Sequence, residues 1–427
     1  MAACATRPLV QSCRTPLRLS SCFQCALCTQ PRLLSEALTR RNERYLSSSR
    51  ALRSQPQQPE RFTYNVAASY IAKDRPYDPS THVFHFNPYN RVQPPKKRSK
   101  HSRPESGQDA FFVSRIDDTG GVAVGVADGV GGWMDSGVDP ADFSHGFCDY
   151  MAAAAYEHRP AAAASSNEST GEVVKDVQAL TARQLMQIGY DAVCADSSIQ
   201  AGGSTAIVGL FEPDGVLEVA NLGDSGFIHL RLNAVHACSE PQTHAFNTPF
   251  QLSVIPPSIM HRMAAFGGAH LSDLPRDAEV SRHRLRHGDV LVFASDGVWD
   301  NLFNQDILRL VSGAMRRSGA WVDSGAGIRV APDLGPLTAT REASSSDDAA
   351  AAKKQQQALQ TVQSMIATEI TFAAKAASVN TKLDGPFAKE VKKYYPQEVW
   401  HGGKVDDICV VAVVVSESVT APVKSKL

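Results

Sequence analysis

The most apolar runs of this 427-residue chain stop or start at aspartates, and this placement constrains the fold more than any other feature. Short, continuous apolar runs that are bounded by turn residues are typical of buried β-strands. The aspartates at the ends of such runs are Asp128, Asp224, Asp296 and the pair Asp406 and Asp407, which stands directly before the last run, 408–415. If the last strand pairs antiparallel with its neighbours, its start lies beside their ends. All these carboxylates would then meet at one edge of a sheet.

Such a set of aspartates has two interpretations. Asp-Gly dipeptides, such as those at Asp128 and Asp296, are common in turns, where the aspartate only bonds nearby backbone. Several carboxylates at one edge would repel one another strongly unless cations neutralised them. Because the set offers oxygen ligands without a His or Cys cluster, it favours Mg²⁺ or Mn²⁺ over zinc. The repeated placement at the ends of the most buried runs favours the metal interpretation.

The pattern of apolar residues predicts an α+β domain. Strands are expected where apolar runs are short and flanked by turn residues, at 110–114, 121–127, 204–211, 215–222, 226–232, 289–294 and 408–415. Helices are expected where apolar residues follow helical spacing, at 141–157, 173–195, 305–317 and 356–379. Grouped strands with segregated helices are more consistent with antiparallel sheets than with alternating parallel units.

Composition divides the chain into a leader, a linker and one globular domain. Residues 1–60 hold nine Arg, no Lys and three Glu. An Arg- and Ser-rich, acid-poor leader is typical of a mitochondrial transit peptide, and a disordered basic tail is the alternative. The expected segments are a leader at 1–54, a Pro- and basic-rich linker at 55–104, a domain at 105–417 with flexible insertions near 158–171 and 323–355, and a tail at 418–427.

Charge gives little indication of a partner. Lys and Arg total 43 while Asp and Glu total 44, so the net charge does not favour a nucleic-acid partner, and we expect none. We also expect no transmembrane segment. One basic run stands out before the domain, formed by Lys96, Lys97, Arg98, Lys100 and Arg103. It is either a solvated segment or a lip that attracts phosphate to a nearby site.

Five motifs, in order, resemble the type 2C, metal-dependent protein phosphatase family. They are GVADGVGGW at 125–133, GGSTA at 202–206, ANLGDSG at 220–226, ASDGVWD at 294–300 and GGKVDDI at 402–408. Three further segments, 132–133, 137–140 and 246–252, are similar to the mitochondrial PTC-seven-like branch of that family. The motifs extend over nearly the whole expected domain, so the resemblance is specific.

The resemblance implies a β-sandwich of two mostly antiparallel sheets flanked by antiparallel helices, with two Mg²⁺ or Mn²⁺ ions in a cleft at one edge. Position by position, Asp128 would bridge both ions and the Gly129 carbonyl would hold one of them. Asp296 and Asp406 would complete the other ion's ligands, and Asp109 would act mainly through water. The positions of a weaker third cation match Asp224 and Asp300. The family pattern favours Asp406 over Asp407 as the ligand.

The implied function is hydrolysis of phosphoserine and phosphothreonine esters by a metal-activated water, with Asp128 and Asp296 as the catalytic pair. The implied substrates are phosphorylated proteins of the mitochondrial matrix, with a link to coenzyme Q biosynthesis, and the implied state is a monomer. The alternative is a catalytically weak pseudophosphatase or adaptor that keeps the fold.

The chain departs from the family pattern at two places that matter for catalysis. Many relatives have a His directly after the first Asp-Gly, proposed as general acid, whereas this chain has Val130. Many also have an Arg that clamps phosphate shortly before the first acidic motif. The candidates here are Arg98 and Arg103, which are out of register, and Gln108 replaces a frequent acid. The leaving-group acid and the phosphate clamp are therefore left open.

Overall fold

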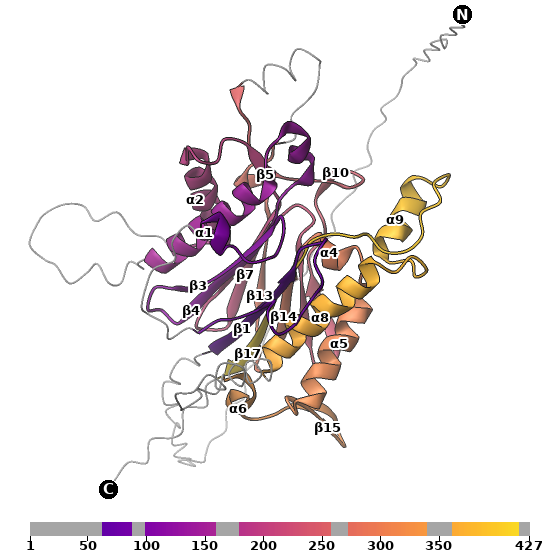
Figure 1. Ribbon diagram of the computed structural model, residues 1–427. Helices are drawn as coiled ribbons and strands as arrows, with labels where there is room; N and C mark the ends of the chain where they lie inside the picture. Colours follow the sequence, from indigo (N-terminus) through magenta and orange to yellow (C-terminus); the bar gives the residue numbers. More distant parts are fainter. Residues whose placement is uncertain (1–61, 88–98, 159–178, 258–271, 340–360, 418–427) are drawn as a thin grey trace, which may run out of the picture. The chain divides into compact units, whose positions relative to one another are not determined.

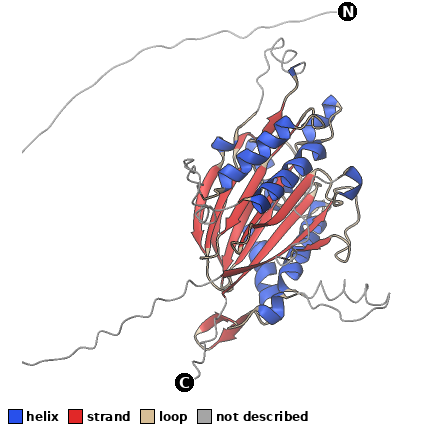
Figure 2. Ribbon diagram, turned by 90° about the vertical axis from the view of Figure 1, so that its left-hand side faces the viewer, coloured by secondary structure: helices blue, strands red, loops and turns tan. Residues whose placement is uncertain are grey.

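Two antiparallel sheets stack face to face and carry helices on their outer faces (Figure 1). The computed structural model describes residues 62–87, 99–158, 179–257, 272–339 and 361–417. Figure 2 shows the strands lying between two groups of helices. This arrangement confirms the predicted α+β class and the β-sandwich that the family resemblance implies.

The two sheets hold six and five strands. The first sheet, in the order β2-β1-β17-β14-β8-β9, consists of Val83–His85, Phe62–Ile71, Ile408–Glu417, Val290–Ala294, Gly226–Arg231 and Ala234–Cys238. The second, in the order β13-β7-β6-β4-β3, consists of Glu279–Arg284, Val216–Leu222, Ala206–Phe211, Gly121–Asp128 and Asp109–Ile116. Neighbouring strands are antiparallel throughout both sheets.

Helices cover the outer faces, and short strand pairs join the larger elements. The helices are α1 (Pro140–Glu157), α2 (Ala182–Ala195), α4 (Asp296–Trp299), α5 (Asn304–Arg317), α6 (Gly335–Thr338), α8 (Val362–Ser378) and α9 (Pro386–Tyr394). The short strands are β5 (Gly202–Ser204), β10 (Thr243–Ala245), β11 (Thr248–Pro249), β12 (Leu252–Val254), β15 (Trp321–Ser324) and β16 (Gly327–Val330). In the described part of the chain, no helix combines the length and the apolar character that crossing a membrane would need.

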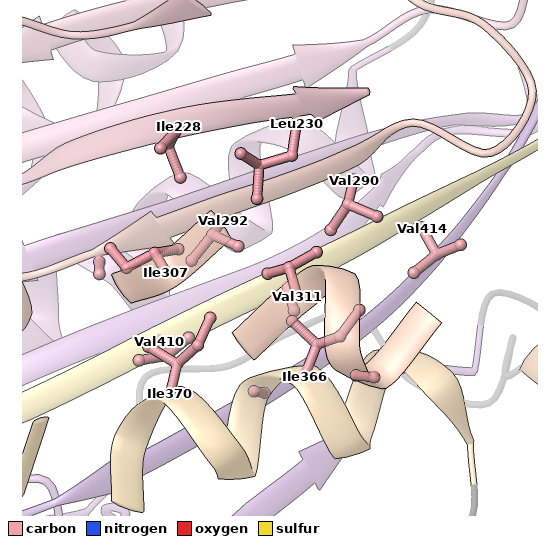
Figure 3. Close-up of a cluster of buried hydrophobic side chains, with 14 of the residues drawn as sticks. Ile228, Leu230, Val290, Val292, Ile307, Val311, Ile366, Ile370, Val410 and Val414 are labelled. Atoms are coloured by element: carbon pink, nitrogen blue, oxygen red, sulfur yellow. The ribbon is translucent and has the colours of Figure 1, made fainter. Parts of the chain in front are cut away.

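Strand β17 explains why the last apolar run is continuous rather than alternating. Successive side chains of a strand point to opposite faces. Val410 and Val414 pack with α5 and α8 on the outer face, whereas Val411 and Val413 pack between the sheets. Figure 3 shows the outer cluster, in which side chains of α5 and α8 pack against side chains of the six-stranded sheet. The helices contribute Ile307, Val311, Ile366 and Ile370, and the strands contribute Ile228, Leu230, Val290, Val292, Val410 and Val414. Both faces of the strand are buried, so each of its positions is apolar.

The prediction of a linker over 55–104 is wrong for part of this segment, because Phe62–Ile71 forms β1 inside the six-stranded sheet. It pairs with β17 along its whole length and with β2 on its other side. The prolines from Pro76 onward suggested a segment without regular structure, but 62–71 contains none. Its apolar side chains, including the buried Phe62, Tyr64 and Val66, belong to the core between the sheets. The ordered domain therefore begins well before residue 105.

Other boundaries also differ from the expected ones. The helix expected at 173–195 begins, in its described part, at Ala182, because Thr181 and Gln184 form reciprocal hydrogen bonds that cap it. The insertion expected to be flexible at 323–355 begins with the β15–β16 hairpin. That hairpin is anchored by the buried Trp321, whose indole N–H donates to the Gly288 carbonyl at 3.0 Å.

Several expected segments lie outside the described residues. They are the leader 1–54, residues 159–171 of the insertion near 158–171, residues 340–355 of the insertion 323–355, and the tail 418–427. The remaining strand and helix predictions are confirmed to within a few residues, except that 204–211 is split between β5 and β6.

A buried ion pair joins two strands of the six-stranded sheet at Asp289. Its carboxylate accepts from Nε and Nη2 of Arg231, both at 2.7 Å, and from the Arg286 amide at 2.8 Å. His229 Nε2 lies 2.9 Å away. Burial acts to raise the pKa of Asp289, but hydrogen bonds from Arg231 and His229 outweigh it and hold the pKa below its usual range. The ionised carboxylate therefore stabilises the fold.

We expect Asp289→Ala to lower the free energy of unfolding by about 3–5 kcal/mol, because the buried His229 and the partly buried Arg231 would both lose their partner. Urea denaturation at pH 7 measures this. As the folded pKa is depressed, the contribution is full above the unfolded pKa of about 4 and shrinks as pH falls below it. The matched control is Asp323→Ala, which removes an exposed pair with Arg316 and should change stability by less than about 0.5 kcal/mol. Equal losses in both variants would contradict the prediction.

Candidate functional site

The strand pairing brings the sequence-predicted aspartates to one edge of the sandwich. Asp109 and Asp128 are direct partners in the β3–β4 register. In the other sheet, β17 runs antiparallel to β14, with Val410 opposite Ala294. Asp296, just after β14, and Asp406, just before β17, therefore lie at the same edge. The antiparallel pairing on which the prediction depended is confirmed.

Three of these carboxylates are close enough to share an ion. One oxygen from each of Asp128, Asp224 and Asp296 lies within 4.8 Å of the other two. They come from the end of β4, the β7–β8 turn and the first residue of α4. The family resemblance implied only a weak third-cation role for Asp224, whereas the structure groups it directly with Asp128 and Asp296.

The backbone at Asp128 is fixed by the neighbouring strand, which leaves its carboxylate free for the site. Its amide donates to Thr205 Oγ1 at 3.2 Å, and its carbonyl accepts from the Thr205 amide at 2.9 Å and from Ser204 Oγ at 2.8 Å. The next residue must be small, because a Cβ on Gly129 would lie 2.9 Å from the carbonyl oxygens of Gln108 and Pro140. The Asp-Gly pair thus reflects close backbone packing as well as site chemistry.

Asp109 is buried, and a hydrogen bond from a neighbouring serine holds its carboxylate. It is 1% exposed, and its Oδ2 accepts from Ser295 Oγ at 2.5 Å. Ser295 Oγ in turn accepts from the Cys409 amide at 3.0 Å. The other oxygen, Oδ1, is buried without a hydrogen-bond partner among the described residues, as is Oδ1 of Asp224. Buried acceptors of this kind require a donor or a cation.

Lys404 inserts a positive charge into the cluster. Its Nζ lies 2.6 Å from Asp296 Oδ2, 2.7 Å from Asp300 Oδ2 and 3.2 Å from Asp406 Oδ2. The sequence analysis assigned no role to this lysine of the motif 402–408. Its position two residues before Asp406 could have indicated that it lies near the site. The ammonium group links the three carboxylates of this side of the cluster.

The two adjacent aspartates of the last motif have different surroundings. Asp407 is 3% exposed and accepts from two backbone amides, those of Lys73 at 2.7 Å and Gln108 at 2.8 Å. Gly107 leaves room for it, since a Cβ at that residue would overlap its carboxylate. Asp406, by contrast, is more exposed and lies within ion-pair distance of Lys404 and, at 3.9 Å, of Lys73 Nζ.

The carboxylates of the cluster are costly to ionise together. Burial and the charge of Asp407 raise the pKa of Asp109, while burial and the charge of Asp296 raise those of Asp128 and Asp224. The same two causes raise the pKa of Asp300 to about 7, against the opposing effect of Lys404. Burial acts to lower the pKa of Lys404, but the charges of Asp296 and Asp300 outweigh it and raise the pKa.

These surroundings fit divalent cations. The donors are carboxylate oxygens, as Mg²⁺ and Mn²⁺ prefer. Two of these oxygens are buried without a partner, on Asp109 and Asp224. Cations at the cluster would satisfy those acceptors and relieve the repulsion that raises the pKa values.

The basic candidates for holding phosphate are not brought to the cluster by any described contact. Arg98 lies outside the described residues. Arg103 donates from Nη2 to Asp142 at 2.9 Å, and Lys100 binds the same carboxylate at 2.7 Å. Gln108, which replaces a frequent acid, donates to the Met134 sulfur at 2.9 Å. The guanidinium of Arg103 is thus engaged with α1.

Comparison with known protein sequences agrees with the motifs. A profile of the family described as Protein phosphatase 2C matches residues 98–325, more than half of the chain. The chain is 32% identical over 246 residues to "Protein phosphatase 2C homolog 7, mitochondrial" of Saccharomyces cerevisiae. This match covers 58% of this chain and 64% of the yeast protein. It is 35% identical to "Protein phosphatase PTC7 homolog" of Xenopus laevis over 48% of this chain and 60% of the relative.

The matches span about three fifths of the length of these two relatives. Among solved structures, the chain is similar to the photosystem II phosphatase PBCP, with a TM-score of 0.47 and 24% identity, over 72% of this chain and 91% of that one. On the family profile, the chain belongs to the protein phosphatase 2C family.

Proposed function

We propose that this chain is a metal-dependent protein serine/threonine phosphatase that hydrolyses phosphoserine and phosphothreonine esters as a monomer. Its membership of the protein phosphatase 2C family supports the proposal. The observation that carries it is the meeting of Asp128, Asp224 and Asp296 within 4.8 Å at one sandwich edge. The buried, unpartnered oxygens of Asp109 and Asp224 add to it.

The proposed ligands of two Mg²⁺ or Mn²⁺ ions are Asp128, the Gly129 carbonyl, Asp296 and Asp406, with Asp109 acting through water. Asp224 and Asp300 could hold a third ion. Cations bound there would supply an activated water for in-line attack on phosphorus and would neutralise charge on the phosphoryl oxygens.

The chain's own residues would position these groups. Ser295 holds the Asp109 carboxylate at 2.5 Å, and Thr205 fixes the backbone of Asp128. Both constraints pre-organise the edge before substrate arrives, so less ordering is required during reaction. Val130 carries no ionisable group, and we therefore propose that the proton for the leaving alkoxide comes from water rather than from the residue after Gly129.

A pocket of about 460 Å³ beside the cluster supports the proposal that a protein segment binds there. Its lining includes Asp224, Trp299, Phe303 and Pro386. Concave sites with a few polar groups and apolar walls commonly bind ligands. We propose that it receives residues flanking the phosphorylated side chain.

The activity is tested with a phosphothreonine peptide. We expect phosphate release that requires Mn²⁺ or Mg²⁺ and stops with EDTA. Asp128→Asn should lower kcat/KM by about a hundredfold or more, since loss of even an outer-sphere partner of a metal site costs 10–100-fold. Phosphate release is followed by a malachite green assay.

The matched control is Asp118→Asn, at the far end of the same β3–β4 hairpin, where Asp118 pairs with Arg115 on the surface. It should leave kcat/KM within about twofold of wild type. Full activity of a folded Asp128→Asn protein would contradict the mechanism. Absence of phosphate release by wild type, despite Mn²⁺ binding, would favour a pseudophosphatase or adaptor.

A second prediction separates Asp406 from Asp407. Asp406→Asn should weaken Mn²⁺ binding by about tenfold or more without lowering the metal-free melting temperature. Asp407→Asn should instead destabilise the fold by about 2 kcal/mol, because the amides of Lys73 and Gln108 donate to different oxygens of Asp407 and the NH₂ group of Asn cannot accept one of these bonds. Calorimetric titration and thermal denaturation provide the two measurements. The opposite pattern would identify Asp407 as the ligand.

We also propose that the protein acts in the mitochondrial matrix on phosphorylated proteins, including those of coenzyme Q biosynthesis. The composition of residues 1–54 supports import. The yeast relative carries "mitochondrial" in its name.

Residues 1–54 fused to a fluorescent protein should direct it to mitochondria, because an Arg-rich, acid-poor leader is drawn inward by the membrane potential. The same leader with its nine arginines replaced by glutamine should leave the fusion in the cytosol. Fluorescence microscopy with a matrix marker measures both. Cytosolic fluorescence of the unmodified fusion would contradict the proposal.

A further inference from the structure

Lys404 occupies a position among carboxylates that would suit a cation. Its ammonium nitrogen lies 2.6, 2.7 and 3.2 Å from oxygens of Asp296, Asp300 and Asp406, respectively. The side chain is only 16% exposed. Three carboxylates around one ammonium group leave net negative charge, so the lysine neutralises part of the cluster while leaving it attractive to further cations.

The geometry of the chain holds this lysine in place independently of its charge. The Lys404 amide donates to Asn301 Oδ1 at 3.0 Å, and its carbonyl accepts from Asn301 Nδ2 at 2.9 Å. Further out, the Phe387 ring lies 5.2 Å from the ammonium nitrogen. A substitution at Lys404 would therefore change the charge at the cluster while the backbone bonds to Asn301 remain.

The lysine divides the cluster into two sides. Asp128, Asp224 and Asp296 offer oxygens to a common point. Asp300 and Asp406 meet Asp296 through the ammonium group instead. An ion bound by Asp128, Asp224 and Asp296 could bind while Lys404 stays paired with Asp300 and Asp406. An ion bound by Asp296, Asp300 and Asp406 would instead have to displace the ammonium group from their oxygens.

We propose that Lys404 is a built-in cation of this centre, which takes the place of a divalent ion among Asp296, Asp300 and Asp406 and competes with metal for their oxygens. The proposal rests on the proposed function only for the nature of the competing ions. Its consequence is that the wild-type chain binds fewer ions, or binds its weakest ion less tightly, than its carboxylates would allow. It also keeps these carboxylates together before metal is bound.

The test compares the metal-stripped full chain with Lys404→Met, which keeps the length of the side chain and removes its charge. Titration calorimetry with MnCl₂ should find one additional ion per chain, or a weakest site whose dissociation constant falls about tenfold, the scale on which groups beside a metal site alter its affinity. In EDTA, the variant should melt at a lower temperature than wild type, because the buried Asp296 and the partly buried Asp300 and Asp406 lose their counter-ion.

Lys393→Met is the matched control, since Lys393 lies on α9 and pairs only with the exposed Glu390 among described residues. It should match wild type in both measurements. Unchanged or weaker Mn²⁺ binding by Lys404→Met would overturn the proposal, because a lysine with a merely structural role would weaken the site when removed.

The outcomes also distinguish this proposal from the proposed function. Normal Mn²⁺ binding by wild type, with no difference in Lys404→Met, overturns the role of Lys404 alone. Failure of both proteins to bind Mn²⁺ overturns the competition and the metal-dependent mechanism together. Tighter binding by the variant supports the competition even if no phosphatase activity is found.

Discussion

The antiparallel pairing of β17 with β1 and β14 is the constraint on which the rest of the structure depends. It buries both faces of the strand, so β17 contributes to the core between the sheets and to the core beneath α5 and α8. The same pairing places the residues before Ile408 beside those that follow Ala294. Burial of the strand and assembly of the carboxylate edge are thus consequences of one register.

The electrostatics of that edge follow from burial. Burial of the carboxylates raises the pKa values of Asp109, Asp128 and Asp224, and repulsion between neighbouring carboxylates raises them further. The protein uses neighbouring groups to different ends. A hydroxyl orients Asp109, two backbone amides stabilise Asp407, and the ammonium group of Lys404 neutralises part of the charge. The site therefore combines groups that are already satisfied with acceptors that still require a cation.

Much of the fold could be predicted from the sequence, because most strands and helices have strong local patterns. The helix α1 starts at Pro140, one residue before the expected range 141–157, with Asp139 as its cap. Strand β1 was not predicted, because the prolines that follow it placed the expected start of the domain at residue 105. The segment 62–71 itself contains no proline. The hairpin that begins at Trp321 was not predicted, because the Gly- and Ser-rich composition of the segment indicated a flexible loop. The buried Trp321 side chain nevertheless anchors it to the domain. The average composition of a segment does not reveal a single buried residue that holds it in place.

The sequence by itself determined that aspartates stand at the ends of buried strands and that its motifs resemble one family. Only the tertiary structure decided the partner of each side chain. Asp406 and Asp407 are chemically identical neighbours, yet Asp407 accepts from two backbone amides whereas Asp406 lies within ion-pair distance of Lys404. Lys404 meets Asp300 across 104 positions of sequence. Local periodicity specifies which face a residue occupies, whereas the contacts across that face depend on how distant strands and loops pack.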